Sequence, residues 1–226
     1  GAGGNVGASV VGTYGSIQVA ADGSYTYTPN TTTAKALGAG QTATDTFTYT
    51  IKDGDGDLST TTLKVNVANQ TVTGGVGSES DTSVLEAALS FGSNPTSNEE
   101  VATGTLTGMG GAGGYTFTAG TFTGAYGTLV INTDGSYTYT LTSAPDVNPG
   151  NNGNNVQASE SFSFQVTDTD GNSGNGTLVI DIVDDVPTAK ADVASVDEGS
   201  TVTGNVVTGV GIGSMADIFG ADGANA

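Results

Sequence analysis

Two acidic loops carry side-chain oxygens at a regular spacing that would suit a metal ion. They are Asp53-Gly54-Asp55-Gly56-Asp57 and Asp168-Thr169-Asp170-Gly171-Asn172. An acid or amide stands at every second position, so several side-chain oxygens can turn toward one point. Carboxylates held this close repel each other unless a cation lies among them, and an all-oxygen ligand set suits a hard ion such as Ca²⁺. We therefore predict two calcium sites, formed by Asp53, Asp55 and Asp57 and by Asp168, Asp170 and Asn172.

A plain hairpin tip is the alternative interpretation of each loop, because Asp-Gly is also common turn chemistry. Apolar residues alternate on both sides of the loops, as in Phe47, Tyr49 and Ile51 before the first. A period of two indicates half-buried strands, so each loop joins two strands of a β core. The presence of two loops in the same structural context favours calcium.

Four other acidic positions receive simpler interpretations. Asp22-Gly23 and Asp134-Gly135 stand between alternating segments and predict tight hairpin turns. Asp45 and Glu160 open the strands that lead to the acidic loops. We expect both of these side chains to lie on the solvated surface.

Composition excludes several classes of function. The chain has 23 acidic residues, four lysines and a net charge of −19, so nucleic acid and anionic membranes are poor partners. Self-repulsion at this charge is relieved by divalent cations, although acidity also simply keeps an extracellular protein soluble. Cysteine and histidine are absent, which excludes Ser-His-Asp triads and histidine-ligated zinc. The carboxylates lack apolar walls that would raise a pKa, so we expect no enzyme, and no apolar run predicts membrane insertion.

An internal repeat predicts the domain organisation. The 37 glycines, with abundant threonine and valine, indicate an all-β fold. The segment from Tyr14 to Thr28 recurs 112 residues later, from Tyr126 to Thr140. This period matches immunoglobulin-like (cadherin-like) β-sandwich repeats, which take about 100 residues each.

The repeat also predicts where the domains divide. Residues 70–185 form a complete sandwich, residues 1–69 correspond to the C-terminal part of a repeat, and residues 186–226 correspond to the N-terminal part of the next. We expect one repeat to be split between the two chain ends, which would pair head to tail between copies or fold back within one chain. In such a topology each acidic loop lies beside the linker that precedes its domain. This placement adds Asp81, Asp184, Asp185 and Asp192 to the predicted metal ligands.

The motifs together resemble a known family. Val186-Pro187-Thr188-Ala189-Lys190-Ala191-Asp192, Asp197-Glu198-Gly199 and the Asp53–Asp57 loop resemble the VCBS-like and bacterial immunoglobulin-like tandem repeats of giant RTX adhesins. The resemblance implies type I secretion, a place on the surface of a Gram-negative bacterium, and calcium-dependent stiffening of a long stalk. It also implies a role in attachment and biofilm formation, with ligand-binding modules, such as those for extracellular polysaccharide, elsewhere in the parent protein.

The sequence therefore predicts a calcium-stiffened extender segment of a surface adhesin, partnered by neighbouring repeats or head-to-tail copies. A carbohydrate-binding adhesion module is one alternative, in which the ion would be open and would lie beside an exposed polar patch. A head-to-tail extracellular filament subunit is another.

Overall fold

The computed structural model describes residues 5–145, 156–211 and 215–223, and its regular structure is almost entirely β-strand. This confirms the predicted all-β fold class. The chain divides into two compact units. The first contains residues up to Thr73 with the segments Gly108–Tyr115 and Thr167–Gly174, and the second contains Gly74–Thr107, Thr116–Val166 and Asn175 onward. The predicted boundaries at residues 69 and 185 stay a prediction.

The first unit is built from two small sheets. β1 (Ser9–Val11), β2 (Gly15–Val19) and β3 (Tyr25–Pro29) form one antiparallel sheet, and β4 (Thr42–Lys52) and β5 (Leu58–Ala68) form a long hairpin. The rings of Tyr27 and Phe47 lie 6.1 Å apart edge to face, so the apolar faces of the two sheets meet there. The short helix α1 (Thr31–Lys35) follows β3 because the Asn30 side chain caps its first turn.

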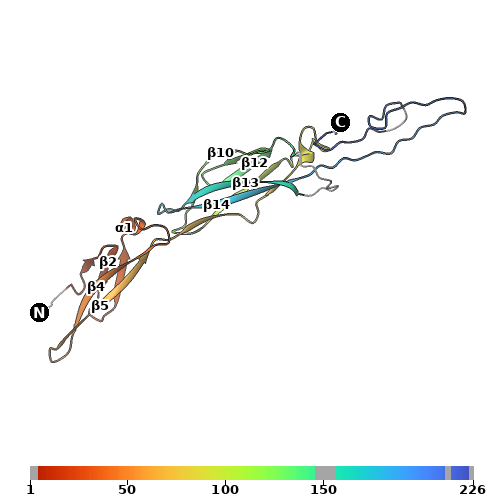
Figure 1. Ribbon diagram of the computed structural model, residues 1–226. Helices are drawn as coiled ribbons and strands as arrows, with labels where there is room; N and C mark the ends of the chain where they lie inside the picture. The colour runs from red at the N-terminus through yellow and green to blue at the C-terminus, as the bar shows by residue number, and fades with distance from the viewer. Residues whose placement is uncertain (1–4, 146–155, 212–214, 224–226) are drawn as a thin grey trace. The chain divides into compact units, whose positions relative to one another are not determined.

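The second unit contains a complete two-layer sandwich (Figure 1). Its first sheet has the order β10-β11-β12-β8-β6, and its second has the order β7-β14-β13-β9. The strands are β6 (Val72–Val76), β7 (Ser83–Leu85), β8 (Val101–Gly110), β9 (Thr116–Phe117), β10 (Gly120–Thr123), β11 (Gly127–Ile131), β12 (Ser136–Leu141), β13 (Val156–Thr167) and β14 (Ser173–Val183).

Alternation along these strands builds the core between the two layers. Inward residues such as Leu129, Tyr139, Phe164 and Ile180 are buried, and each contributes about 1.5–3 kcal/mol on folding. The Tyr139 and Phe162 rings lie 5.9 Å apart between the facing sheets. The hydrophobic alternation in the sequence thus places a sandwich core where it was expected.

Both Asp-Gly turns are observed as predicted. Gly23 and Gly135 each have a φ of 87°, a left-handed conformation that favours glycine. Asp22 and Asp134 accept hydrogen bonds from the backbone N–H and hydroxyl of the serine two residues on. These two acids therefore stabilise the turns that join β2 to β3 and β11 to β12.

The segment after β14 contains little regular structure. Among its described residues there are only two isolated bridges, between Thr188 and Ile218 and between Asn205 and Val210. The first bridge brings residues 217–222 back toward the end of β14 (Figure 1). No helix among the described residues is long and apolar enough to cross a membrane.

Candidate metal centre

Two groups of three carboxylates come together within the described residues. The first contains Asp53, Asp55 and Asp57, and the second contains Glu86, Asp184 and Asp222. In each group one oxygen per residue lies within 4.8 Å of the others. Both groups therefore offer an all-oxygen set of ligands of the kind that calcium prefers.

The first group lies at the exposed tip of the β4–β5 hairpin. Asp53 Oδ1 accepts hydrogen bonds from the N–H groups of Gly56, at 2.9 Å, and Asp57, at 2.7 Å. The pKa of Asp53 is lowered, first by a hydrogen bond with the Asp55 side chain and then by these backbone donors. The three carboxylates lie at an exposed turn outside the core, so the tip could receive a cation without rearranging the core.

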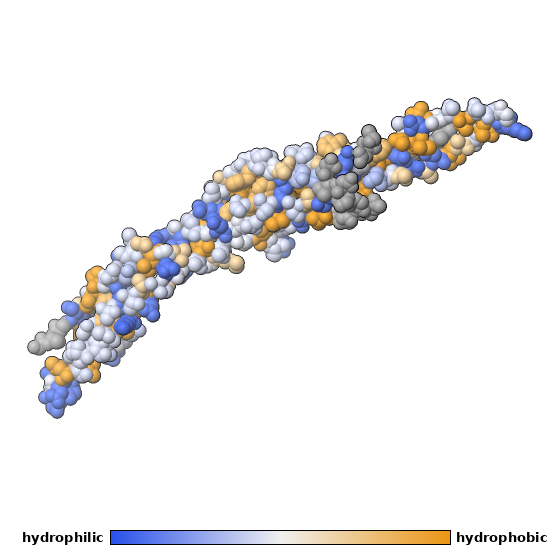
Figure 2. Space-filling model, in the orientation of Figure 1, coloured by the Kyte–Doolittle hydropathy of each residue, from blue (hydrophilic) through white to orange (hydrophobic). Residues whose placement is uncertain are grey.

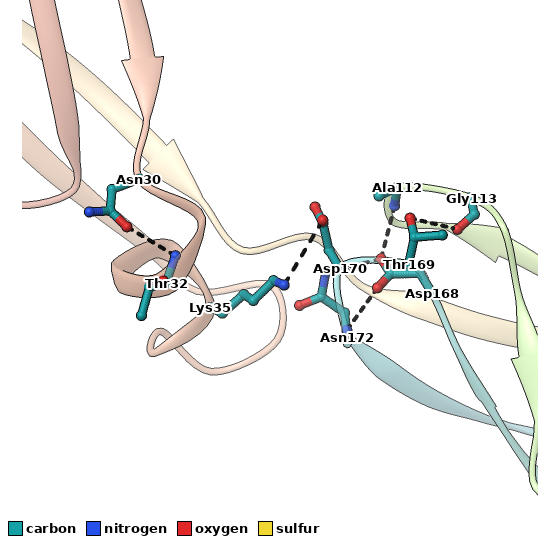
Figure 3. A network of polar contacts seen from close by, with 9 residues as sticks. All are labelled: Asn30, Thr32, Lys35, Ala112, Gly113, Asp168, Thr169, Asp170 and Asn172. Carbon is teal, nitrogen blue, oxygen red and sulfur yellow. Dashed lines mark hydrogen bonds and ion pairs between the residues drawn. The ribbon is translucent and has the colours of Figure 1, made fainter.

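The second acidic loop is arranged differently, although it matches the first in sequence. Asp168 is buried and accepts from Ala112 N at 2.9 Å, from Asn172 N at 2.8 Å and from Asn172 Nδ2 at 3.0 Å (Figure 3). Burial would raise the pKa of Asp168, but these donors outweigh it and the pKa is lowered. The Asp168 carboxylate thus fastens the loop at residues 110–114 to the hairpin.

Asp170 and Asn172 complete this loop. Asp170 Oδ1 lies 3.9 Å from Lys35 Nζ in a solvent-exposed ion pair, which contributes at most about 1 kcal/mol (Figure 3). Asn172 points its amide donor at Asp168. The three side chains form no carboxylate group like the other two, and the metal role of Asp168, Asp170 and Asn172 stays a prediction.

Glu86 is the most unusual acid in the second group. Its side chain is 0% exposed, and neither carboxylate oxygen accepts a hydrogen bond of normal geometry, although the Asp185 N–H is close enough to influence its pKa. Burial, followed by the charge of Asp222 and then those of Asp184 and Asp185, raises the pKa of Glu86 to about 7, against the opposing effect of the Asp185 backbone N–H. An unpaired buried carboxylate is costly, so the site calls for a proton or a cation.

The fold brings the second group together from three segments. β7 pairs in parallel with β14, and Leu85 lies opposite Val183, so η1 (Glu86–Ala88) starts beside the linker at Asp184. Burial raises the pKa of Asp184 as well. Asp222 arrives from the returning segment, where Gly220 packs against the Asp185 carbonyl without room for a side chain. Only Asp184 of this group was predicted from the sequence.

The remaining predicted ligands have other partners or lie apart. Asp185 is buried and accepts from Ser93 N at 2.8 Å and Ser93 Oγ at 2.5 Å. Asp81 is exposed and accepts from Ser83 N at 3.1 Å, whereas Asp192 is half-buried. None of the three belongs to either carboxylate group, so their metal roles also stay predictions.

Sequence analysis missed Glu86 and Asp222. Glu86 carried a usable signal, because it is a single acid inside the apolar segment from Val84 to Leu89. Asp222 carried none, since its approach depends on the path of the preceding residues. A local sequence pattern predicts single strands and turns, but it does not predict that residues 217–222 fold back toward the end of β14.

The expectation that Asp45 and Glu160 are solvated is wrong. Both are buried: Asp45 accepts from the N–H groups of Thr13 and Tyr14 and from Tyr27 Oη, at 2.8, 3.0 and 2.8 Å. Glu160 likewise accepts from the N–H groups of Ala125 and Tyr126 and from Tyr139 Oη. Burial and Asp45 raise the pKa of Tyr27 to about 12. Each acid shares the parity of the inward aromatics on its strand, which explains its burial.

Comparison with known proteins yields one family match. The model for a bacterial cadherin-like domain matches residues 2–69. No curated protein matches. Among solved structures, the chain is similar to the C-terminal 282-residue fragment of intimin in complex with the translocated intimin receptor (Tir) intimin-binding domain. The sequence identity is 14% and the TM-score 0.28, over 64% of this chain and 60% of the fragment's length.

Proposed function

We propose that this protein is a calcium-stabilised extender segment of a large bacterial surface adhesin. The observation that carries the proposal is Glu86, a completely buried carboxylate that accepts no hydrogen bond of normal geometry and lies beside Asp184 and Asp222. The match of residues 2–69 to a bacterial cadherin-like domain supports it, because cadherin-like domains generally bind calcium.

A divalent cation answers the electrostatic problem of this site. Three acidic side chains converge there, while the whole chain has only four lysines against its net charge of −19. Without a counter-charge, an ionised Glu86 is destabilised by burial and by its acidic neighbours. Calcium accepts six to eight oxygen ligands in flexible geometry, so carboxylates from different segments, carbonyls and water can all contribute.

The ion would act mechanically. Glu86 follows β7, Asp184 follows β14, and Asp222 belongs to the returning segment. One ion bound by all three joins the end of the sandwich to the residues that leave it. Free rotation at this joint is then replaced by a fixed attachment, which is how calcium would stiffen a stalk of such domains.

The wider setting of the proposal is extracellular. The protein would be secreted by a type I system, remain on the surface of a Gram-negative bacterium, and project adhesive modules for attachment and biofilm formation. Its own role would be structural and not catalytic. Extracellular modules typically bind calcium at about 10⁻⁴ to 10⁻³ M, near the concentration outside cells.

A carbohydrate-binding module is the competing function. A cavity of about 320 Å³ in the first unit is lined by Tyr27, Asn69 and Asp170, among others, and could accept a polar ligand. However, the candidate ion is bound mainly by a buried acid, whereas a lectin-type ion must be open to its ligand. Burial of Glu86 therefore favours the structural role.

Thermal unfolding of the full chain, first in chelator and then in rising calcium, tests the proposal. At about 100 times the Kd, calcium stabilises the native state by about 2.7 kcal/mol, so the transition of the second unit is expected to rise. Glu86→Gln is expected to lose most of this gain, because an amide supplies a weaker ligand of the same size. Magnesium is expected to give much less, since it demands stricter octahedral geometry.

Two matched variants identify the site. Asp134→Asn also removes one charge from the second unit, but it lies in an exposed turn outside both carboxylate groups and should leave the calcium response unchanged. Asp53→Asn reports on the hairpin tip. If Glu86→Gln retained the full calcium response, the assignment of the ion to Glu86 would be wrong; no response in the parent chain would overturn calcium altogether.

A further inference from the structure

The hairpin of the first unit exposes an apolar face that the equivalent hairpin of the second unit buries. Residues of β4 and β5 recur 115 positions later in β13 and β14, as Ile51 does in Val166. Ile51 is 63% exposed and Val166 is 0% exposed. Tyr49 and Tyr25 are likewise exposed, whereas their counterparts Phe164 and Tyr137 are buried. The first unit therefore has the apolar residues of a sandwich core at these positions, but no other described part of the unit covers them.

Strand pairing explains the difference. In the second unit, β12 pairs with β8, and β14 pairs with β7. Within the described residues of the first unit, β3 has a partner only in β2, and β5 has one only in β4. The outer edges of β3 and β5 are therefore open, and open edges of this kind invite another strand.

The segment at residues 193–210 contains the sequence that would fit. Ser83-Val84-Leu85-Glu86, which forms β7 and the start of η1, recurs 112 positions later as Ser195-Val196-Asp197-Glu198. Val84 is 0% exposed, but Val196 is 55% exposed. Other valines of this segment are exposed too: Val193, Val202, Val206, Val207 and Val210. Figure 2 shows apolar surface in the part of the molecule after the sandwich.

We propose that Ser195–Asp197 of one copy adds to the open edge of β5 in a second copy. The added strand would run parallel to β5, as β7 runs parallel to β14. Transfer of the observed register, in which Asp181, Ile182 and Val183 face Ser83, Val84 and Leu85, places Ser195 beside Asn66, Val196 beside Val67 and Asp197 beside Ala68. Main-chain hydrogen bonds supply affinity and Val196 supplies the buried contact. This pairing does not depend on calcium, so it stands apart from the proposed function.

Cysteine crosslinking tests the register directly, because the chain has no cysteine of its own. Asn66 and Ser195 are both exposed, so Asn66→Cys and Ser195→Cys leave the core intact. Adjacent strands lie about 4.8 Å apart, within the range that a disulfide spans. The two single variants are mixed under mild oxidation, in chelator and in calcium, with enough salt to screen the charge of each copy.

A crosslinked pair of chains is expected from Asn66→Cys mixed with Ser195→Cys. Thr60→Cys, which lies on the same face of β5 but out of register, is the matched control and should crosslink at least tenfold less. Val196→Asp should abolish concentration-dependent association of the parent chain without unfolding it, because this valine is already exposed. Val179→Asp, at an exposed valine of the complete sandwich, is its control.

Three outcomes would overturn the proposal. If a chain carrying both Asn66→Cys and Ser195→Cys crosslinked only within itself, the occupant of the edge would be the chain's own segment. If Thr60→Cys crosslinked as well as Asn66→Cys, the crosslinks would come from random collisions between chains and not from strand pairing in the proposed register. Absence of any crosslink, in calcium and in chelator alike, would show that the edge of β5 does not accept this strand.

Discussion

Buried acids in this protein fall into two classes that differ by their partners. Asp45, Asp168 and Glu160 each accept several hydrogen bonds from N–H or hydroxyl donors. For Asp45 and Asp168 these donors lower the pKa despite burial. Glu86 is equally buried, but neither of its carboxylate oxygens accepts a hydrogen bond of normal geometry. The first class holds segments together by itself, whereas the second needs something added. Burial alone therefore does not mark a candidate metal ligand, because a buried acid with enough donors is already satisfied.

The pKa of Glu86 makes a prediction about pH in chelator. Its folded-state value of about 7 lies above its usual 4.5, so the native state holds the proton more tightly than the unfolded state does. The protonated Glu86 side chain therefore makes its full contribution to the free energy of unfolding below pH 4.5, and this contribution is lost as the pH rises to about 7. The shift corresponds to a loss of about 3 kcal/mol in the free energy of unfolding.

Denaturant unfolding between pH 4.5 and 7.5 measures this loss. Glu86→Gln should remove most of the dependence and leave the part that belongs to Asp184, whose pKa is also raised by burial. Calcium should flatten the dependence by keeping the carboxylates bound in their ionised form. Asp45 and Asp168 act outside this window, because their lowered pKa values make their contribution disappear only in acid, below the usual 3.8. Stability that stayed constant or rose from pH 4.5 to 7 would contradict the prediction.

Among the elements, the two Asp-Gly hairpins offer a matched experiment. Gly23 and Gly135 share a φ of 87°, so Gly→Ala strains both turns by about 1 kcal/mol. A Cβ on Gly23 would meet nothing within 4 Å. A Cβ on Gly135 would lie 2.6 Å from the Phe117 ring and 3.1 Å from the Leu106 carbonyl oxygen. Gly135→Ala should therefore cost a further 1–3 kcal/mol or so from overpacking.

The measurement is the loss of unfolding free energy that each alanine causes in its own unit. Equal losses at the two positions would show that the turn conformation, and not the packing of Phe117, dominates. The comparison also measures how much the structural surroundings change the effect of the same substitution in two copies of one sequence repeat. The two turns are the same locally, and only their surroundings differ.

That distinction explains how much could be predicted from the sequence. Alternation around Phe47 and Phe162, and the Asp-Gly turns, are local signals, and they predicted the hairpins and the all-β class correctly. The environment of each repeat is not local. Asp168 is covered by residues 110–114, while Asp53 in the matching loop is exposed. Glu86 and Asp222 meet only because a distant segment returns, so the position of Asp222 could not be predicted from the sequence.

At the scale of the whole molecule, the two units differ in how completely their cores are covered. The second contains a full sandwich, whereas the first leaves the β4–β5 face open. Their stabilities should differ accordingly, because buried apolar area dominates the free energy of folding. Calorimetry of the full chain at micromolar concentration and in chelator is expected to show two transitions, the lower one from the first unit.

Calcium and protein concentration should then act on different transitions. Calcium is expected to raise the upper one, because Glu86, Asp184 and Asp222 all belong to the second unit. Higher protein concentration is expected to raise the lower one, because a strand from a second copy would cover the open face of the first unit. Asp53→Asn tests whether calcium binds at the hairpin tip instead. If calcium raised the lower transition and this variant abolished the rise, the ion would be bound there. A single transition at every condition would mean that the two units unfold together, and the difference in core coverage would then have no separate thermodynamic effect.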